Sequence, residues 1–524
     1  MTIMKTNILV FLHNTLGYGV GTIIIFGITF YFAFIRKRRT SKMMSMLQSF
    51  NQMPAIPIIG SLYLLMGNPR ERTAKVIKAW NTYETPFVVW LMNTPLVCIT
   101  EHEDTQEILN TSHHVEYLGT FEKFFRNSIQ QSQGEKWRKS RQLASAAFSS
   151  TMMREYFTTV NEHSAILAKE LEPLSDTDEV IDIKSYISMS NLNSTLRNFT
   201  GYKMYSSRKE RVEFIDAISK AIQMESDRYT VPFLLPKIMY EAYLFLFRKR
   251  YVYDTMQNLA KKIVRERLAT YNTKTNTPSE GTDQDTVATG PKLYIDLLLQ
   301  RYNTDADITK EHVEDEVFGI IFGSLGTTSE TVCFLSLMLA IHQEAQQKVY
   351  DEIEIICGDT DQEFQKEDLK KLVYLEQCVN ETLRKFTIVP VDFRTHHEDI
   401  MLKNGQVIPA GCLVLLALYK IHHNKKFFPN ADNWDPRHFD RERITQWRQS
   451  FFPFGSGPRL CVGSKYAMMS IKIQLVHLLR RYRLTTEMKM RDIHIVFGMV
   501  TQNDSGYRLK LHSRVKNERS DMSA

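Results

Sequence analysis

A cysteine near the C-terminus stands among residues that suit metal chemistry. Cys461 lies in a segment of the pattern F-x-x-G-x-R-x-C-x-G, which runs from Phe454 to Gly463. The thiolate form of cysteine, and not the thiol, is a metal ligand. Gly457 and Gly463 would let the backbone approach the sulfur so that N–H groups point at it, whereas a Cβ at either position would crowd them. We therefore predict that Cys461 is a thiolate ligand of a metal.

Heme iron is the metal that this chemistry favours. A thiolate pushes electron density onto heme iron and so promotes cleavage of an O–O bond. In such a site Arg459 would pair with a heme propionate, and Phe454 would shield the thiolate from water. The alternative is a buried, inert cysteine in a glycine turn, ahead of a helix that begins near Ser464. We expect that ordinary role for the other cysteines, which form no C-x-x-C pair.

The cysteine segment resembles that of the cytochrome P450 family, whose members hold heme b (iron protoporphyrin IX) through a cysteine thiolate. The resemblance extends over residues 54–514 and is densest between 308 and 510. It implies a mainly α (α+β) fold, in which a large helical domain with small β-sheets surrounds a buried heme. The overall layout is most like the insect branch of family 4. Members of that branch often carry a glutamate that esterifies the heme at the position of Gly323, so glycine here predicts a non-covalent heme.

Further residues match heme contacts of that family. Trp137 and Arg141 form a W-x-x-x-R pair, and residues four apart share one face of a helix. The resemblance implies that both contact a propionate; without it, they would be a packed aromatic residue and a solvated charge. Arg394 matches the family's second propionate-binding arginine. We therefore expect these three side chains to converge with Arg459 on one group.

Glu381 and Arg384 match the E-x-x-R pair of the family. At a spacing of three they share one face of a predicted helix, which by itself is typical of a solvated surface. The resemblance implies instead a buried structural pair behind the heme. The arginine that normally completes this group is displaced, because His438 occupies its position and Arg437 precedes it. Either residue could substitute.

A long helix is predicted from Glu311 to Ala340, and the resemblance places it over the distal face of the heme. Thr327 occupies the position of the family's conserved alcohol, followed by Thr328, but the preceding acid is replaced by Gly326. The acid and the alcohol normally relay protons, and losing a positioned proton donor typically lowers a rate 10²–10⁴-fold. Two glycines within a helix cost about 1 kcal/mol each relative to alanine. We therefore expect the helix to distort or to leave room there.

The N-terminal part reads as a membrane anchor. Its uncharged run is long enough to cross a bilayer as a helix, and the basic residues 36–39 that follow favour a cytosolic location for the body. A cleaved signal peptide is the alternative. We predict five regions: a short segment (1–16), a transmembrane anchor (17–35), a basic and proline-containing linker (36–60), a catalytic domain (61–514) with a mobile loop at about 273–289, and a disordered tail (515–524).

The net charge of +7 and the pI near 8.8 are compatible with acidic partners or an anionic membrane surface. Nucleic acid is a poor fit, since no dense basic helix or zinc-finger spacing accompanies the charge. The resemblance implies NADPH–cytochrome P450 reductase as electron donor, with cytochrome b5 as a second candidate, on the endoplasmic reticulum membrane. A basic face for these proteins would include Lys136, Lys139, Arg437 and Lys465.

The predicted function is a monooxygenase that inserts one oxygen atom of O₂ into an apolar substrate with electrons from NADPH. A fatty acid, an insect hormone or a foreign compound such as an insecticide would fit the resemblance. Because Gly326 replaces the acid, two alternatives stay open. One is heme-thiolate chemistry on peroxides without O₂ activation, by an isomerase or a peroxygenase. The other is a heme-binding membrane protein with no turnover.

Overall fold

The computed structural model describes residues 41–57, 59–92, 94–111, 114–115, 127–204, 208–228, 234, 237–276, 293–358 and 364–514. The predicted anchor at 17–35 and the predicted tail at 515–524 lie outside these residues. Most of the loop predicted at 273–289 does too, but its first positions, 273–276, belong to helix α11 (Arg250–Asn276).

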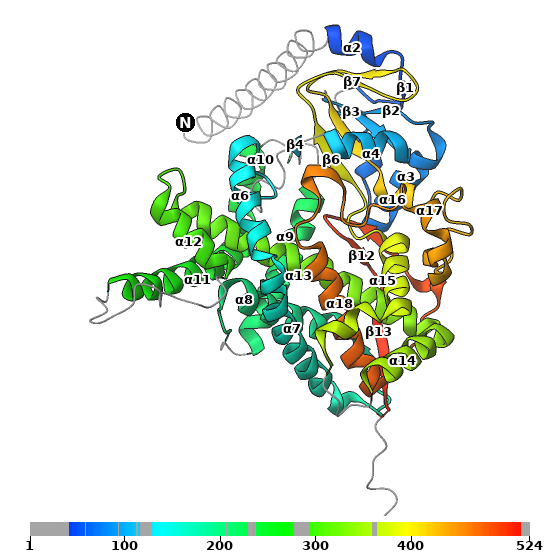
Figure 1. Ribbon diagram of the computed structural model, residues 1–524. Coiled ribbons are helices and arrows are strands. Elements are labelled where there is room, and N and C mark those ends of the chain that lie inside the picture. The colour runs from blue at the N-terminus through cyan, green and yellow to red at the C-terminus, as the bar shows by residue number, and fades with distance from the viewer. Residues whose placement is uncertain are drawn as a thin grey trace, which may run out of the picture.

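Helices make up most of the body, and a small sheet forms one side of it (Figure 1). The sheet has six strands in the order β1-β2-β3-β9-β6-β4. Their bounds are Asn51–Gln52, Phe87–Leu91, Thr94–Ile99, Leu413–Leu416, Asp392–Thr395 and His114–Val115. This arrangement of many helices with small sheets confirms the predicted fold class.

The remaining elements are short sheets and the helices that surround the centre. The strands are β5 (Ile181–Asp182), β7 (Ile400–Met401), β8 (Val407–Ile408), β10 (Tyr482–Thr485), β11 (Ile495–Phe497), β12 (Thr501–Asn503) and β13 (Arg508–Ser513). The principal helices are α2 (Ser41–Leu47), α3 (Pro69–Thr82), α4 (His102–Thr111), α6 (Gly134–Ala147), α7 (Ser150–Glu170), α8 (Lys184–Thr200), α9 (Arg208–Arg228), α10 (Lys237–Leu246), α12 (Tyr294–Thr304), α14 (Gln343–Cys357), α15 (Val373–Phe386) and α18 (Ser464–Arg481).

Helix α13 (Lys310–Ile341) runs through the middle of the molecule and packs against α8, α15 and α18 (Figure 1). Thr309 caps its N-terminus by accepting a hydrogen bond from the backbone N–H of His312 at 3.2 Å. Among the described residues it is the one helix long and apolar enough to cross a membrane. Because 78% of its apolar window is buried inside the protein, α13 is a core helix.

An aromatic cluster joins the helices next to α13. Phe148, Tyr156, Phe199 and Tyr466 come from the end of α6 and from α7, α8 and α18, and their ring centroids lie 5.0–6.4 Å apart. Tilted and edge-to-face aromatic pairs at such distances are favourable. The cluster therefore fixes the first turns of α18, which directly follow Cys461.

Candidate active site

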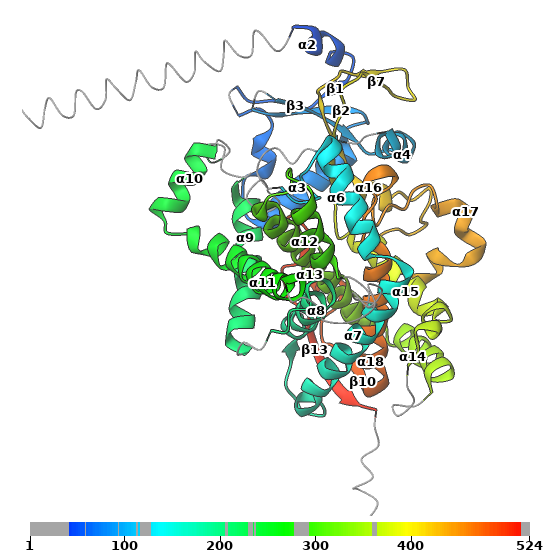
Figure 2. The ribbon, with the colours of Figure 1, turned by 60° about the vertical axis from the view of Figure 1, so that its left-hand side comes forward.

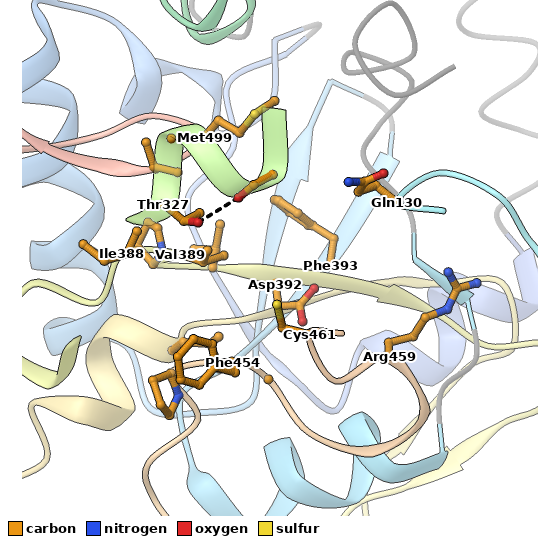
Figure 3. Close-up of a pocket in the computed structure, with 18 of the residues that line it drawn as sticks. Gln130, Thr327, Ile388, Val389, Asp392, Phe393, Phe454, Arg459, Cys461 and Met499 are labelled. Atoms are coloured by element: carbon orange, nitrogen blue, oxygen red, sulfur yellow. Dashed lines mark hydrogen bonds between the residues drawn. The ribbon is translucent and has the colours of Figure 1, made fainter. Parts of the chain in front are cut away.

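A cavity of about 580 Å³ lies between α13 and the segment that contains Cys461. Figure 3 shows Thr327 on its upper side and Cys461 below. Most of its wall is apolar, with residues drawn from distant parts of the chain that include Trp80, Phe87, Ile222, Ile320, Phe322, Ile388, Val389, Val391, Phe393, Phe497 and Met499. A cavity of this size and lining suits an apolar small molecule or an organic cofactor.

Cys461 lies in a tight loop, and its exposed surface faces this cavity. The backbone N–H of Cys461 donates to the carbonyl oxygen of Phe454 at 3.0 Å, which closes the loop. Burial by the surrounding protein raises the pKa of the thiol, while the backbone N–H of Gly463 and the charge of Arg141 lower it. A metal ion would displace the thiol proton, because metal binding requires the thiolate.

The glycines of this loop act differently from the prediction. Gly457 has a φ of +66°, and a Cβ there would lie 2.2 Å from the carbonyl oxygen of Leu109 at the end of α4. Glycine is therefore required for close contact with α4, and not for access to the sulfur. At Gly463 a Cβ would lie 3.7 Å from Phe148 and 3.9 Å from the Cys461 sulfur, which are ordinary contacts. A Cβ at either position would therefore not crowd the sulfur, but the predicted approach of a backbone N–H to the sulfur is present at Gly463.

Arg459 and Arg141 line the cavity beside the cysteine loop. The Arg459 guanidinium lies 4.1 Å from the centre of the Trp137 ring and donates to the backbone oxygen of Ser132 at 3.0 Å. Arg141 donates to the backbone oxygen of Leu460 at 2.7 Å, and burial lowers its pKa. The W-x-x-x-R helix face thus holds the cysteine loop in place as well as facing the cavity.

Arg394 reaches the same cavity from β6. It is 2% exposed, and one of its terminal nitrogens donates to Asp392 and, at 2.9 Å, to the backbone oxygen of Phe393. Its Nε atom is buried and has no hydrogen-bond partner among the described residues. A buried donor without an acceptor is unfavourable, and an anionic ligand would supply one. These arginines beside a cysteine thiol suit a heme with its two propionates.

Glu381 and Arg384 form a fully buried pair on α15. Two guanidinium nitrogens of Arg384 donate to the two carboxylate oxygens of Glu381, each at 2.7 Å. Arg384 also donates to the backbone oxygens of His422 and Ala431 at 3.0 Å and of Asn433 at 2.9 Å. The pair therefore ties α15 to the chain segment that precedes the cysteine loop.

His438, and not Arg437, completes this group. The Nδ1 atom of His438 lies 3.2 Å from both carboxylate oxygens of Glu381, and its Nε2 lies 2.6 Å from the backbone oxygen of Pro429. Arg437 points away and pairs with Asp435 at 2.7 Å, with a largely exposed side chain. The sequence left open whether His438 or Arg437 completes the group, and these hydrogen bonds select His438.

The distal wall contains the predicted threonines. The Thr327 hydroxyl donates to the backbone oxygen of Gly323 at 2.8 Å, and Thr328 is buried. The helix stays α-helical through this segment, so of the two predicted outcomes, distortion or room, the structure shows no distortion. Room is present, however, because a Cβ at Gly326 would meet no atom within 4 Å.

Two polar residues of the wall were missed from the sequence. Glu316 is buried on α13, and burial raises its pKa to about 7. The Tyr294 hydroxyl donates to it at 3.1 Å. Gln130 lies near the same helix and donates to the backbone oxygen of Gly319 at 2.9 Å. Glu316 precedes Gly323 by seven residues, and this spacing could have placed it on the same helix face as Gly323. The sequence around Gln130 contains no pattern that would have indicated its position in the wall.

The basic residues predicted to form a docking face are partly engaged within the chain. Lys139 forms ion pairs with Asp305 at 3.1 Å and Asp307 at 3.4 Å. Lys136 donates to the side chain of Asn127 at 2.8 Å. Lys465 is exposed at the start of α18. A docking face would therefore depend more on Lys465 than on the two lysines of α6.

Comparison with known proteins shows what the chain resembles. The family model described as cytochrome P450 matches residues 51–511. Cytochrome P450 4c3 of Drosophila melanogaster is 24% identical, over 95% of each chain. Cytochrome P450 4c21 of Blattella germanica is 26% identical, over 97% of this chain and 100% of that protein. Leukotriene-B4 omega-hydroxylase 3 of Mus musculus is 26% identical, over 81% of this chain and 82% of that protein.

Proposed function

This chain belongs to the cytochrome P450 family, and from that premise we propose that it is a microsomal enzyme that hydroxylates a fatty acid, an insect hormone or a foreign compound. The coarser function follows from the family and its family 4 relatives: a heme-thiolate monooxygenase that acts on apolar substrates, with electrons supplied from NADPH through a reductase. The observation that supports the proposal most is the apolar cavity, bounded by Cys461 on one side and by Thr327 on the other.

We assign the heme-binding roles as follows. Cys461 would hold the heme iron through its sulfur, and Phe454 together with the closed loop would keep water from that sulfur. Arg459, Arg141 and Arg394, which line the cavity, would hold the propionates, and Trp137 positions Arg459 through its ring face. When bound, the heme supplies the activation of O₂ and the transfer of one oxygen atom. Glu381, Arg384 and His438 stabilise the segment behind it.

The protein itself must deliver protons to the cavity. The hydrogen of the Thr327 hydroxyl points to the carbonyl oxygen of Gly323, so its oxygen is left to accept a hydrogen bond from water or substrate. Thr328, the next residue, is almost fully buried and also lines the cavity. With Gly326 in place of the acid, the open space beside α13 must be filled by water if protons are to pass there.

The substrate proposal rests on the lining of the cavity. Aromatic and aliphatic side chains from α3, β2, α13, β6 and β11 surround most of it, so that apolar groups lose water on entry. Fatty acyl chains, insect hormones and insecticides all carry apolar groups that would lose water in this way. The selection among them depends on the polar residues of the wall.

Membrane association is supported by an exposed apolar surface on α10 and the start of α11. Phe245 and Leu246 are each 72% exposed and Ile238 is 78% exposed. The basic residues Arg248, Lys249 and Arg250 follow directly. Figure 2 shows α10 at the edge of the body. An apolar surface flanked by basic residues is typical of contact with the headgroup region of a membrane, in agreement with an anchor at 17–35 and a body on the cytosolic side of the endoplasmic reticulum.

The electron donors are expected to bind on the side of the cysteine loop. NADPH–cytochrome P450 reductase is the family's general partner, and cytochrome b5 is proposed as a second donor. Exposed Lys465, four residues after Cys461, would meet an acidic surface of either protein.

The function is tested with the full chain in membranes that also contain the reductase. NADPH is added with a lauric acid probe, a sesquiterpenoid probe and an insecticide probe, and products are identified by mass spectrometry. At least one product with one added oxygen atom, formed only with NADPH and O₂, is expected. Oxidation driven by peroxide alone, with none from NADPH, would contradict the proposal.

A further inference from the structure

One charged residue of the cavity wall is not used by the heme site. Six charged side chains of the described residues line the cavity: Arg72, Arg141, Glu316, Asp392, Arg394 and Arg459. Three of the arginines are assigned to the propionates, and Asp392 accepts from Arg394. Glu316 accepts from the Tyr294 hydroxyl and from the backbone N–H of Ile129. Arg72 therefore remains as a charge in the wall that the heme contacts do not explain.

Arg72 lies near the start of α3 and is 8% exposed. The helix packs against the turn η1 (Leu62–Leu65) and against β11. We call the part of the cavity beside these elements the α3 end. A charge in apolar surroundings is unfavourable unless acceptors or an anion compensate it. Most of the side chains around the α3 end are apolar, namely Leu64, Leu65, Val76, Trp80 and Phe497.

The other polar side chains of the α3 end are hydroxyls that already donate within the protein. The Thr73 hydroxyl donates to the backbone oxygen of Pro69 at 2.9 Å. The Ser61 hydroxyl donates to the backbone oxygen of Pro54 at 3.2 Å. Each hydroxyl has a single hydrogen, whereas a guanidinium has five N–H donors. Arg72 can therefore bind a carboxylate through two of its donors while others contact the protein.

We propose that Arg72 is a specificity-determining residue that binds a carboxylate group of the substrate. This deepens the proposed function and rests on it. A guanidinium and a carboxylate match in charge and in shape, because two parallel N–H···O bonds can form between them. The cavity is continuous from α3 to Cys461, so the chain of such a substrate extends along the apolar wall from Arg72. Apolar carboxylic acids are thus favoured over neutral hormones and neutral foreign compounds.

The test compares lauric acid with lauramide, its neutral amide, at about pH 8, where the acid is ionised. The two probes share one chain, so the difference between them reports the contact with the charge. Dissociation constants are measured on the full heme-loaded chain in vesicles from the ligand-induced change in its absorption spectrum. Arg72→Gln should weaken the binding of laurate about 10–100-fold, as expected for the loss of a charge-assisted contact, and should change that of lauramide less than about twofold.

Two further variants of Arg72 separate charge from shape. Arg72→Lys keeps the charge but loses the planar pair of donors, so it should weaken the binding of laurate less than Arg72→Gln does. Arg72→Met provides a second neutral side chain of similar length, in case the glutamine variant does not fold. Each probe partitions into the vesicles equally in all samples, so the variants are compared with the wild type for one probe at a time.

Arg70→Gln is the matched control. Arg70 stands two residues earlier on α3, forms an ion pair with Asp504 at 2.6 Å and does not line the cavity. Its variant removes the same charge from the same helix, but on the outside of the cavity. Both probes should bind to it as they bind to the wild type.

The proposal would be overturned by no binding of laurate to the wild type, by equal losses for laurate and lauramide in the neutral Arg72 variants, or by an equal loss of laurate binding in Arg70→Gln. These results are separate from a failure of the proposed function, because binding is read without turnover. An inactive protein that binds laurate through Arg72 would contradict the monooxygenase and leave the role of Arg72 standing. An active enzyme whose binding of laurate does not depend on Arg72 would do the reverse.

Discussion

At the scale of single residues, Gly326 departs most from the family pattern. The structure leaves open space beside it, since a Cβ there would meet no atom within 4 Å. Gly326→Asp should therefore fold, and it would return a proton donor to the position next to Thr327. We expect the amount of product per NADPH consumed to rise by up to about 100-fold, the lower end of the range for a positioned acid. The measurement is product formation against NADPH oxidation.

Gly326→Asn is the matched control for that variant, because its side chain has the same size but does not ionise. It should leave the coupling of NADPH to product near the wild-type value. An equal gain in both variants would show that filling the space, and not the acid, is what matters. No gain in either would place the proton route elsewhere along the cavity.

His422 is a second residue with a defined effect. The backbone N–H of Phe452 donates to its Nε2 at 2.9 Å, so its Nδ1 carries the hydrogen and donates to the Thr387 hydroxyl at 3.0 Å. Burial, and then the charge of Arg384, lowers the pKa of His422 to about 3. The folded protein therefore keeps this ring neutral in a pH range where the unfolded chain binds a proton.

Stability should consequently fall as the pH drops from about 6.5 towards 3, with a contribution from His422 of about 1.4 kcal/mol per pH unit. His422→Gln keeps an acceptor and a donor but cannot take up a proton in this range. The free energy of unfolding of this variant is measured with denaturant between pH 7.5 and 5. Its decrease per pH unit should be smaller than that of the wild type by about 1.4 kcal/mol. His494→Gln, at an exposed position, should leave the slope unchanged. Identical slopes in all three proteins would contradict this assignment.

At the scale of elements, α15 is joined to the turn η5 (Pro436–Phe439) through His438. The ring of His438 is buried and contacts Glu381 and Pro429. His438→Leu should cost about 1.5–3 kcal/mol, because it removes one hydrogen bond to a buried carboxylate that keeps its pair with Arg384. His438→Arg should lose much less, since a guanidinium offers donors to the same two oxygens. Thermal unfolding and heme content, measured together, check both variants.

Equal losses in the two His438 variants would mean that the position serves packing alone. Arg437→Leu is the control, because Arg437 pairs with Asp435 at the surface, where an ion pair contributes little.

The sequence predicted the bounds of helices more accurately than the contacts between side chains. The apolar period between Glu311 and Ala340 matches α13 to within a residue at each end, and the start of α18 at Ser464 was also correct. These features depend on local pattern alone. Which of Arg437 and His438 meets Glu381 depends on how a turn packs against α15, and the sequence could not decide it.

Residues of the site show the same limit. The need for glycine at 457 comes from Leu109, which lies far away in the sequence on α4, whereas the spacing of the motif points only to the nearby sulfur. Gln130 reaches the cavity because Gly319 lacks a side chain. Both contacts are long-range, so no local pattern could have indicated them.

At the scale of the whole molecule, the exposed residues of α10 predict how the body meets a membrane. Phe245→Trp places a fluorescent probe at a site that is 72% exposed in the wild type. With the full chain in vesicles, brominated lipids should quench this tryptophan strongly, as expected for a side chain at the headgroup boundary. Because the chain has other tryptophans, the quenching is compared with that of the wild type.

Ile355→Trp is the control for the membrane prediction. Ile355 is 85% exposed on α14, on the opposite side of the molecule from α10 in Figure 1. A tryptophan there should add fluorescence that brominated lipids do not quench. Quenching of both probes, or of neither, would contradict the proposed orientation.

The central claim is that Cys461 ligates the heme iron, and the carbon monoxide difference spectrum of the reduced protein tests it most directly. Wild type, Cys461→Ser and the control Cys412→Ser are compared in membranes; Cys412 is buried away from the cavity. We predict the red-shifted Soret band of a thiolate-bound heme in the wild type and in Cys412→Ser, and its loss in Cys461→Ser. A band that persists in Cys461→Ser, or that is missing from folded, heme-loaded wild type, would contradict the claim.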